Sequence, residues 1–357
     1  MHLSCVMATF ESRIHALRIE PHPNADRLEL AAVGGFRCVV GKGSFTDGDL
    51  AAYIPEGAVC PDWLIAELGL EGKLAGSRKN RVKAVKLRGA LSQGLVYPVR
   101  DGMIRGRPVA AGDTVTELLE LVKYEPPIPI AMQGEVRPVH GATLHYDIEN
   151  VKKYPGELRD GEPVVITEKL HGSWCCLGWH PDHGPIVTSK GMSDRGMALI
   201  LNEANQKNLY VRTWRAFEAA FGTARARVAG TEQPFYVLGE VHGRGVQDLH
   251  YGEPNPAFRV FDAYVGEPGQ GRYLAPSEIE TSLGDLFPLV PVLYRGPFST
   301  AALTEQTDGA TALGGKHLRE GVVVRPARER ESTEFGRVIL KSVSGNYLTR
   351  KGGTEYN

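Results

Sequence analysis

The sequence has few cysteines, and their spacing suits neither cross-linking nor zinc binding. The 357 residues contain five cysteines, an odd number with no C-x-x-C pair. This pattern argues against a disulfide framework and against a zinc ribbon. Adjacent cysteines on a strand point to opposite faces, so one metal ion would not easily bind both Cys175 and Cys176. We expect reduced, mostly buried thiols at Cys5, Cys38, Cys60, Cys175 and Cys176.

Long apolar runs, an apolar leader and a strong net charge are also missing. No apolar stretch approaches the roughly 20 residues that cross a bilayer. The first residues, MHLSCVMATFESR, lack the basic and long apolar regions of a secretory signal. We therefore expect a cytoplasmic protein that does not bind membranes. A formal net charge of −1 indicates no global attraction to nucleic acid, so such attraction would have to come from local basic patches.

Several common catalytic motifs are absent as well. The sequence contains no H-E-x-x-H and no G-x-S-x-G, which leaves zinc proteases and serine hydrolases without support. Its eleven histidines include no paired metal-ligand spacing. The chemistry must therefore be sought in other patterns of charged residues.

The length and the local patterns predict two domains with a linker. Residues 1–123 contain short strands and tight turns with one short helix, PDWLIAELGL, which favours a small closed barrel. Within them, RLELAAVGGFRCVV predicts a hairpin with a two-residue turn at Gly34 and Gly35. Residues 124–145 begin with the proline-rich YEPPIPIAMQGEVRPVHG, which lacks periodicity and is interpreted as the linker.

Residues 146–357 are predicted to be a larger domain of mixed α and β structure. A helix capped by Ser193 or Asp194 is expected through RGMALILNEANQ, and a second one in YVRTWRAFEAAFG. Strands are expected in PVVITEKL, SWCCLGWH, PFYVLGEV, AFRVFDAYV, GVVVRPA and GRVILKSVS.

A cluster of basic residues lies near the end of the first domain. Its six members are Arg78, Lys79, Arg81, Lys83, Lys86 and Arg88. With a one-residue bulge near Ala84 and Val85, a single strand would carry them on one surface. The pattern alone suits a solvated face and a phosphate-contacting groove about equally. In an oligonucleotide-binding barrel, the groove is favoured.

Four charges interrupt the apolar strands of the second domain. Lys169 follows VVIT, Glu240 ends FYVLGE, Glu320 precedes GVVVR, and Lys341 interrupts RVILKSV. Each alone is more often an ordinary surface charge. Together, two lysines and two glutamates at strand ends are consistent with one cleft between two sheets.

Local sequence words connect these charges to a known family. HPNADRLELAAVGGFRCVVGKG resembles the OB-fold modules of tRNA-binding and RNA-ligase N-terminal domains. EKLHG, LGEVHG, FRVFDAY, EGVVVR and ILKSV resemble, in order, the motifs of covalent nucleotidyltransferases. TEKLHG, the N-terminal OB module and the tail SGNYLTRKGGTEYN resemble the Deinococcus-type ATP-dependent RNA ligases. The resemblance implies an α+β protein: an N-terminal OB-fold β-barrel, then a mixed two-sheet, ATP-grasp-like nucleotidyltransferase domain with flanking helices.

The resemblance also implies a reaction. Such ligases join 3′-OH and 5′-phosphate ends through a lysyl-AMP, here on Lys169, and an AMP-capped nucleic acid. Because only the neutral amine attacks, the pKa of Lys169 would have to fall by about three units. Desolvation and a nearby Mg²⁺ or Mn²⁺ would lower it. Glu320 is the expected metal ligand, through water in the way Mg²⁺ prefers, and Glu240 is expected to assist or to bind the ribose.

By the same resemblance, other residues would bind ATP. Glu168 would face the adenine edge, and Phe261 would stack on its ring, although a core aromatic is the alternative for Phe261. Lys341 would neutralise the α-phosphate oxygens. Lys190, with Arg195 nearby, occupies the place of the acceptor-phosphate motif.

Three positions in these motifs raise specific expectations. His171 would contact phosphates or the water shell of the metal, or else be an ordinary turn histidine. Gly172 would permit a tight reversal. Relatives have a second lysine where this chain has Ile339, so Arg337 is expected to supply the missing charge.

We expect a monomer that binds RNA or a nicked RNA/DNA duplex. Two alternatives remain open at this stage. One is an ATP-dependent DNA ligase with the same lysine chemistry, and the other is a nucleic-acid-binding protein whose nucleotidyltransferase domain is inactive.

Overall fold

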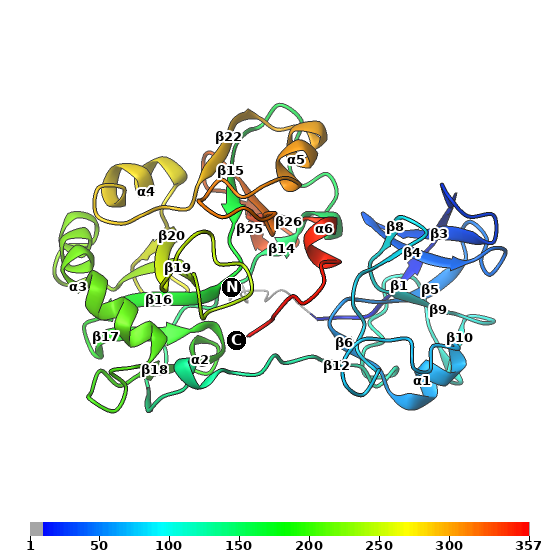
Figure 1. The fold of residues 1–357 in the computed structure, drawn as a ribbon. Helices are drawn as coiled ribbons and strands as arrows, with labels where there is room; N and C mark the ends of the chain where they lie inside the picture. The colour runs from blue at the N-terminus through cyan, green and yellow to red at the C-terminus, as the bar shows by residue number, and fades with distance from the viewer. Residues whose placement is uncertain (1–9, 357) are drawn as a thin grey trace. The chain divides into compact units, whose positions relative to one another are not determined.

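The chain folds into two compact units. The computed structural model describes residues 10–356 (Figure 1). Among them, residues 10–125 and 150–155 make up the first unit, and residues 126–149 and 156–356 the second. No helix in this part of the chain is long and apolar enough to span a membrane.

Short antiparallel strands build the first unit. Its two larger sheets are β1 (Arg13–Ala16), β5 (Leu50–Ile54) and β9 (Leu95–Pro98), and β2 (Arg18–Pro21), β3 (Leu28–Val33) and β4 (Phe36–Gly41). Shorter pairings are β7 (Val85–Leu87) with β8 (Ala90–Ser92), β6 (Ala58–Val59) with β12 (Val122–Lys123), and β10 (Met103–Ile104) with β11 (Arg107–Pro108), besides isolated bridges. The predicted hairpin is confirmed, because Val33 pairs with Phe36 and Gly34 adopts φ +54°.

The predicted short helix of the first unit is also present. It is α1 (Asp62–Glu67), which buries Leu64 and Ile65. These side chains join an apolar core with Ile14 and Ile54, so helix and strands are held together by burial.

The basic cluster does not lie on one strand, contrary to the prediction. Arg78 and Lys79 lie in a turn, where Lys79 has φ +53°. The guanidinium of Arg81 lies 3.5 Å from the ring centre of Tyr124. Arg88 has φ +50° in the turn between β7 and β8. These left-handed turns reverse the chain and interrupt any continuous strand, so the cations are distributed over two turns and the segment between them.

Two five-stranded sheets dominate the second unit. The Lys169 sheet has the order β14 (Glu149–Asn150), β26 (Leu340–Val343), β23 (Gly321–Pro326), β15 (Pro163–Lys169) and β22 (Val292–Pro297). The Glu240 sheet has the order β17 (Gly184–Ser189), β16 (Ser173–His180), β19 (Phe235–His242), β20 (Ala257–Val265) and β21 (Arg272–Tyr273). The six predicted strands are therefore present, and the last of them is divided into β25 (Gly336–Arg337) and β26. β25 pairs with β24 (Glu331–Ser332).

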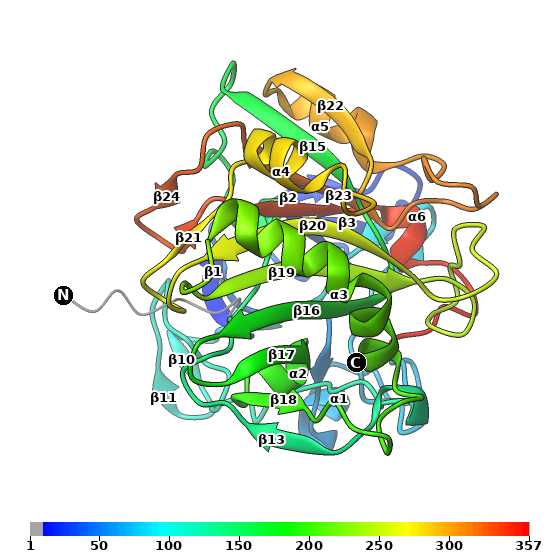
Figure 2. The ribbon, with the colours of Figure 1, turned by 90° about the vertical axis from the view of Figure 1, so that its left-hand side faces the viewer.

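Helices cover the sheets of this unit. The longest, α3 (Leu209–Val228), lies across the Glu240 sheet (Figure 2). The side chain of Asn208 caps it by accepting a hydrogen bond from the amide of Tyr210 at 2.9 Å. The others are α2 (Lys190–Ser193), α4 (Pro276–Leu283), α5 (Thr300–Thr307) and α6 (Gly345–Leu348), with a 3₁₀ turn at η1 (Ile130–Met132). A second 3₁₀ turn, η2 (Val151–Lys153), belongs to the first unit.

The helix predicted after Ser193 is wrong. Ser193 instead ends α2, and its hydroxyl donates to the carbonyl of Leu144 at 2.7 Å. The following residues form β18 (Met197–Leu199), which pairs with β13 (Val136–Pro138). A strand partner distant in sequence thus overrides the local helical pattern.

The segment interpreted as a linker is packed rather than free. Residues 126–145 include β13, and Val139, Ala142 and Leu144 are buried in the second unit. The segment is packed because these apolar side chains are buried. The sequence did not reveal this, since the proline-rich composition suggested a linker. A short later stretch, residues 150–155, belongs to the first unit instead, where the carbonyl of Lys152 accepts a hydrogen bond from the amide of Gly35 at 2.9 Å.

A buried ion cluster connects the two sheets of the second unit. Asp262 on β20 is fully buried, and its carboxylate lies 3.2 Å from Arg325 Nη1 on β23 and 2.5 Å from Arg337 Nη1 on β25. The hydroxyl of Tyr146 donates to the same carboxylate at 2.8 Å. Burial alone would raise the pKa of Asp262, but the two guanidinium groups outweigh it and hold this pKa below its ordinary value.

We predict that Asp262→Asn destabilises the protein by about 3 kcal/mol, because it removes the buried counter-charge that Arg325 and Arg337 share and leaves both with Glu329. Urea unfolding would measure the loss. The control is Asp160→Asn at an exposed position, whose free energy of unfolding should lie within about 0.5 kcal/mol of the wild-type value. Equal stability of the two variants would contradict the importance of the cluster.

Candidate active site

A pocket of about 300 Å³ is lined by both sheets of the second unit. Strands β15, β23 and β26 contribute to it from the Lys169 sheet, and β16, β17, β19 and β20 from the Glu240 sheet. The predicted site residues that line it are Glu168, Lys169, Gly172, Lys190, Glu240, Phe261 and Lys341. The tertiary structure therefore brings together residues from distant parts of the sequence, Glu168 and Lys341 being the farthest apart.

Lys169 is the last residue of β15, where the buried apolar strand reaches the pocket. Its Nζ donates a hydrogen bond to Glu320 Oε1 at 2.6 Å. Pairing of Lys169 with Gly321 on β23 brings the preceding residue, Glu320, beside the amine. Ile166 and its neighbours anchor the strand in the core, so the lysine is held firmly by its backbone.

The turn after Lys169 requires glycine at position 172. A Cβ there would lie 2.1 Å from the carbonyl oxygen of Val241, closer than atoms can approach. The amide of Gly172 donates to Glu240 Oε1 at 3.0 Å. The glycine is therefore needed for close packing against β19, and not for a left-handed backbone.

The amine of Lys169 is more basic in this arrangement than the sequence led us to expect. Burial lowers the pKa of Lys169, but the carboxylates of Glu320 and Glu240 outweigh it, and the net pKa lies above its ordinary value. In this state the lysine is protonated. Activation of the amine therefore requires a change in the charge around the two carboxylates.

Of the two carboxylates, that of Glu320 has unused capacity for a cation. Glu320 Oε2 is buried without a hydrogen-bond partner. Burial, with a further contribution from Glu320, raises the pKa of Glu240 to about 8, against the opposing effect of Lys169. In the described residues no group of three or more His, Cys, Asp or Glu side chains could hold a metal ion. Two acidic ligands completed by water and phosphate oxygens suit Mg²⁺ or Mn²⁺.

Two further lysines add positive charge to the pocket. Lys341 extends from β26, and burial together with the charges of Lys169 and Lys190 lowers its pKa to about 8. Lys190 starts α2 and forms an ion pair with Asp147. A pocket with these cations is suited to bind an anionic group such as phosphate.

The pocket also contains an aromatic slot, and two polar atoms of its lining, Glu168 Oε1 and Trp174 Nε1, are buried without a hydrogen-bond partner. Phe261 and Tyr146 have ring centres 5.5 Å apart, and Trp174 lies next to Tyr146 at 6.4 Å. Glu168 is 1% exposed; its Oε2 accepts a hydrogen bond from the amide of Ala312 at 2.7 Å, whereas its Oε1 has no partner. A flat ring with an amino group would satisfy that oxygen.

His171 does not line the pocket, in contrast to the expected contact with phosphate. It is buried in a polar network in which its Nε2 lies 2.9 Å from Asp248 Oδ1 and its Nδ1 lies 2.9 Å from the hydroxyl of Tyr347. β15 ends at Lys169, so His171 lies in the turn that follows the strand, where Asp248 and Tyr347 hold its side chain. The structure supports the alternative of a turn histidine, with specific partners.

Arg337 does not replace the lysine that is missing at Ile339, and Arg195, expected near the acceptor phosphate with Lys190, does not line the pocket. Arg337 is bound in ion pairs with Asp262 and Glu329. Arg195 is exposed, and its Nε donates to the carbonyl of Gly191 at 2.9 Å. Ile339 itself lines the pocket as an apolar side chain. The expected compensation by a nearby arginine is therefore wrong, because Arg337 is already bound within the buried ion cluster.

Other pocket residues were missed because their sequence signals were weak. They are Tyr146, Asp147, Trp174 and Arg325. Tyr146 and Asp147 lie at the predicted domain boundary, where no motif indicated them. Trp174 directly follows HGS, so proximity to the motif of Lys169 was its only signal. Arg325 ends the EGVVVR motif, and its guanidinium is paired with Asp262.

Comparison with known proteins gives this site a class. An RNA ligase family model matches residues 162–343, which contain all four strand-end charges, and an OB-fold domain model matches residues 10–99. The chain belongs to the RNA ligase family. None of the curated proteins matches the sequence.

Solved structures share the fold of this chain. A point mutant of Naegleria gruberi RNA ligase with ATP and Mn is 24% identical and covers 94% of this chain and 98% of its own, with a TM-score of 0.77. The same ligase with PPi is 23% identical, covers 95% of this chain and 98% of its own, and also has a TM-score of 0.77. The chain is thus a mixed α+β protein with an N-terminal OB-fold domain and an RNA ligase nucleotidyltransferase domain.

We predict that Lys341→Met stabilises the fold at pH 7 by up to about 3 kcal/mol, because it removes a buried charge whose pKa is lowered from 10.5 to about 8. Below pH 8 the wild-type lysine is protonated and its destabilising effect is complete. Between pH 8 and 10.5 the folded state binds fewer protons than the unfolded state, so wild-type stability rises with pH. The difference between variant and wild type in urea unfolding should therefore shrink between about pH 7 and about pH 9.5.

A variant that is less stable than the wild type at neutral pH would show that the stem of Lys341 contributes more by packing than its charge removes. Met retains most of that stem, which makes it the appropriate replacement.

Proposed function

We propose that this protein is an ATP-dependent RNA ligase of the Deinococcus type that joins 3′-OH and 5′-phosphate ends. The observation that carries the proposal is Lys169 at a strand end, 2.6 Å from Glu320, in a pocket with two further lysines and an aromatic slot. Membership of the RNA ligase family supports it. Structures of the Naegleria gruberi enzyme with ATP and Mn, and with AMP and Mn, support ATP and a divalent cation as cofactors.

In the first step, the lone pair of Lys169 Nζ attacks the α-phosphorus of ATP. A P–N bond forms, the P–O bond to pyrophosphate breaks, and the nitrogen releases a proton, which leaves a lysyl-AMP. Glu320 and Glu240 would hold Mg²⁺ or Mn²⁺, and this cation supplies the positive charge that offsets the two carboxylates and favours the neutral amine. The hydrogen bond between Lys169 and Glu320 keeps the nitrogen in place before attack.

The other pocket residues bind and orient the nucleotide. Lys341 neutralises the α-phosphate oxygens while charge moves to pyrophosphate. Phe261 stacks on the adenine, and the unpaired Oε1 of Glu168 accepts a hydrogen bond from its amino group. AMP then passes from Lys169 to an RNA 5′-phosphate, and a 3′-OH displaces it to form the phosphodiester.

The nucleic acid is proposed to be RNA or a nicked RNA/DNA duplex with an RNA 3′-OH end, bound by the protein as a monomer. The OB-fold domain and its basic cluster are the proposed contact surface. Arg78, Lys79, Lys86 and Arg88 are exposed at the surface, whereas Arg81 stacks on Tyr124.

Incubation with α-labelled ATP and Mg²⁺ or Mn²⁺ should label the wild-type protein covalently. Lys169→Ala should abolish labelling, since no other residue replaces the amine, and Lys207→Ala at an exposed site should not change it. Gel electrophoresis under denaturing conditions measures the label. An unlabelled wild type would favour the binding protein with an inactive domain.

Labelled protein supplied with nicked duplexes then distinguishes the acceptors. Faster sealing of a ribose than of a deoxyribose 3′-OH end supports an RNA ligase. Equal rates on both ends would favour the DNA ligase alternative.

Replacement of Arg78, Lys86 and Arg88 by Gln should weaken the binding of a nicked duplex and reduce its salt dependence. Removing one interaction between a basic side chain and a phosphate lowers the slope of log K against log salt by about 0.9, so the slope should fall by up to about 3. Self-labelling with ATP should stay at the wild-type level, because this cluster belongs to the first unit and Lys169 to the second. A variant that binds nicks normally would place the nucleic-acid surface elsewhere.

A further inference from the structure

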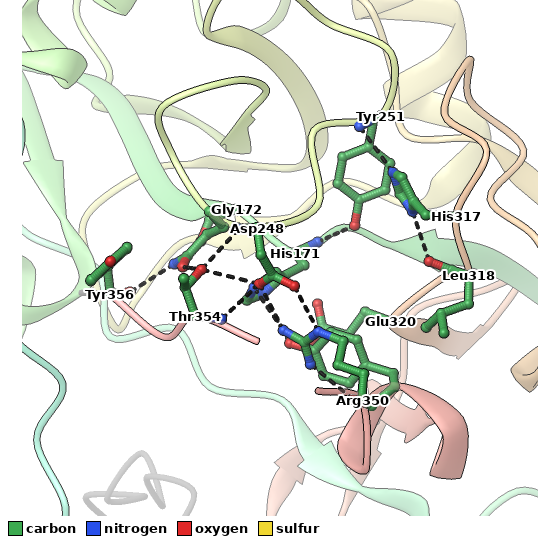
Figure 3. A network of polar contacts seen from close by, with 12 residues as sticks. His171, Gly172, Asp248, Tyr251, His317, Leu318, Glu320, Arg350, Thr354 and Tyr356 are labelled. Carbon is green, nitrogen blue, oxygen red and sulfur yellow. Dashed lines mark hydrogen bonds and ion pairs between the residues drawn. The ribbon is translucent and has the colours of Figure 1, made fainter. Parts of the chain in front are cut away.

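The last described residues, 350–356, form a C-terminal strap that is tied to the loop of residues 247–251. Figure 3 shows Asp248 at the centre of the contacts between them. Its Oδ2 accepts a hydrogen bond from Arg350 Nε at 2.8 Å, and its Oδ1 accepts one from the amide of Thr354 at 2.8 Å. In return, the amide of Asp248 donates to Thr354 Oγ1 at 2.8 Å. One side chain thus holds two points of the strap.

The same carboxylate also reaches the turn that follows Lys169. His171 Nε2 lies 2.9 Å from Asp248 Oδ1, and its Nδ1 lies 2.9 Å from the hydroxyl of Tyr347. Arg350 Nη2, 3.1 Å from the same Nε2, also donates to Asp248 Oδ1 at 2.9 Å. Tyr347 lies in α6, immediately before the strap. His171 is therefore held from two sides by groups that belong to, or anchor, the C-terminal part of the chain.

A strained tyrosine fixes the backbone of this turn. The amide of His171 donates to the hydroxyl of Tyr251 at 2.6 Å, and Tyr251 is buried with φ +56°, a conformation that side chains rarely adopt. Its own amide donates to His317 Nε2 at 3.0 Å, while His317 Nδ1 donates to the carbonyl of Leu318 at 2.8 Å. These contacts over-determine the strained residue, as expected where precise positioning matters.

Gln247 provides a second, independent connection between turn and strap. Its Nε2 has two hydrogens, and its two acceptors are the carbonyl of Gly172 at 3.1 Å and the carbonyl of Tyr356 at 3.1 Å. Because Gly172 also bonds Glu240, this connection brings Tyr356 to the Lys169 end of the pocket. Tyr356 is indeed one of the residues that line the pocket.

We propose that the strap is part of the nucleotide site: Asp248 is a positioning residue that seats it against the turn of Lys169, and Tyr356 forms the pocket wall beside the ribose and phosphates of ATP. This inference rests on the proposed function for the identity of the ligand. The seating of the strap by Asp248 does not rest on it and is tested separately.

Hydrogen exchange measured by mass spectrometry tests the seating without any catalysis. In Asp248→Asn, the peptides that contain residues 350–356 should exchange about tenfold faster than in the wild type, because charge-assisted hydrogen bonds from Arg350 are removed. Thr354→Val should have the same direction of effect, and Thr354→Ser should restore protection. Glu305→Gln, at an exposed position on α5, is the matched control and should leave the exchange unchanged. Wild-type exchange in Asp248→Asn would overturn the seating role.

Single-turnover labelling at increasing ATP concentration tests the contribution to the site. Thr354→Val and Tyr356→Ala should raise the half-saturating ATP concentration by about three- to tenfold, with a limiting rate within about twofold of the wild type. Asp248→Asn should also lower the limiting rate, since it releases His171 beside Lys169. A fall in limiting rate alone, in all three variants, would indicate a purely structural strap and would overturn the proposal.

The two hypotheses fail in different ways. An unlabelled wild type refutes the ligase chemistry. Hydrogen exchange alone then tests whether the strap belongs to the nucleotide site. If it does, ATP added to Lys169→Ala should slow the hydrogen exchange of residues 350–356. Labelled wild type with no effect of ATP on that exchange refutes the strap and leaves the ligase intact.

Discussion

The second unit depends on one buried carboxylate that connects its two sheets. Asp262 lies on the Glu240 sheet, and its side chain binds two arginines, Arg325 and Arg337. Arg325 belongs to the Lys169 sheet. A pocket lined by two sheets exists only while the sheets keep their spacing, and apolar contacts alone specify spacing loosely. A fully satisfied buried ion cluster fixes it through directed hydrogen bonds. Tyr146, which donates to Asp262, also extends this support into the aromatic slot.

The site holds like charges of both signs close together, two carboxylates and three lysines. Burial lowers the pKa of Lys169, but Glu320 and Glu240 outweigh it and raise this pKa, whereas burial together with Lys169 and Lys190 lowers the pKa of Lys341. Like charges held together in a buried place repel one another, and this repulsion adds to burial in raising the pKa of Glu240 and in lowering the pKa of Lys341. A ligand that brings both a cation and several anionic oxygens would relieve both repulsions, because the cation offsets the carboxylates and the oxygens offset the lysines. The fold thus retains buried charges that lower its stability, as is typical of functional sites.

The departures from the expected motif have a common structural basis. The missing lysine at Ile339 and the absence of His171 from the pocket lining would suggest a weakened phosphate site. In the structure, His171 bonds Asp248 and Tyr347 and so connects the turn of Lys169 to the C-terminal strap. The arginine expected to compensate for Ile339, Arg337, instead binds Asp262. Both side chains therefore support the scaffold around the pocket rather than line it.

Local patterns in the sequence determined the strands, the hairpin at Gly34, α3 and the strand-end charges Lys169 and Glu240, because alternation and turn residues act over a few positions. They could not reveal that residues 197–199 form a strand, since its partner β13 is distant in sequence. Nor could they show the pKa of Lys169 or the partners of His171. These depend on distances between side chains from separate strands and loops, which exist only after the sheets have packed.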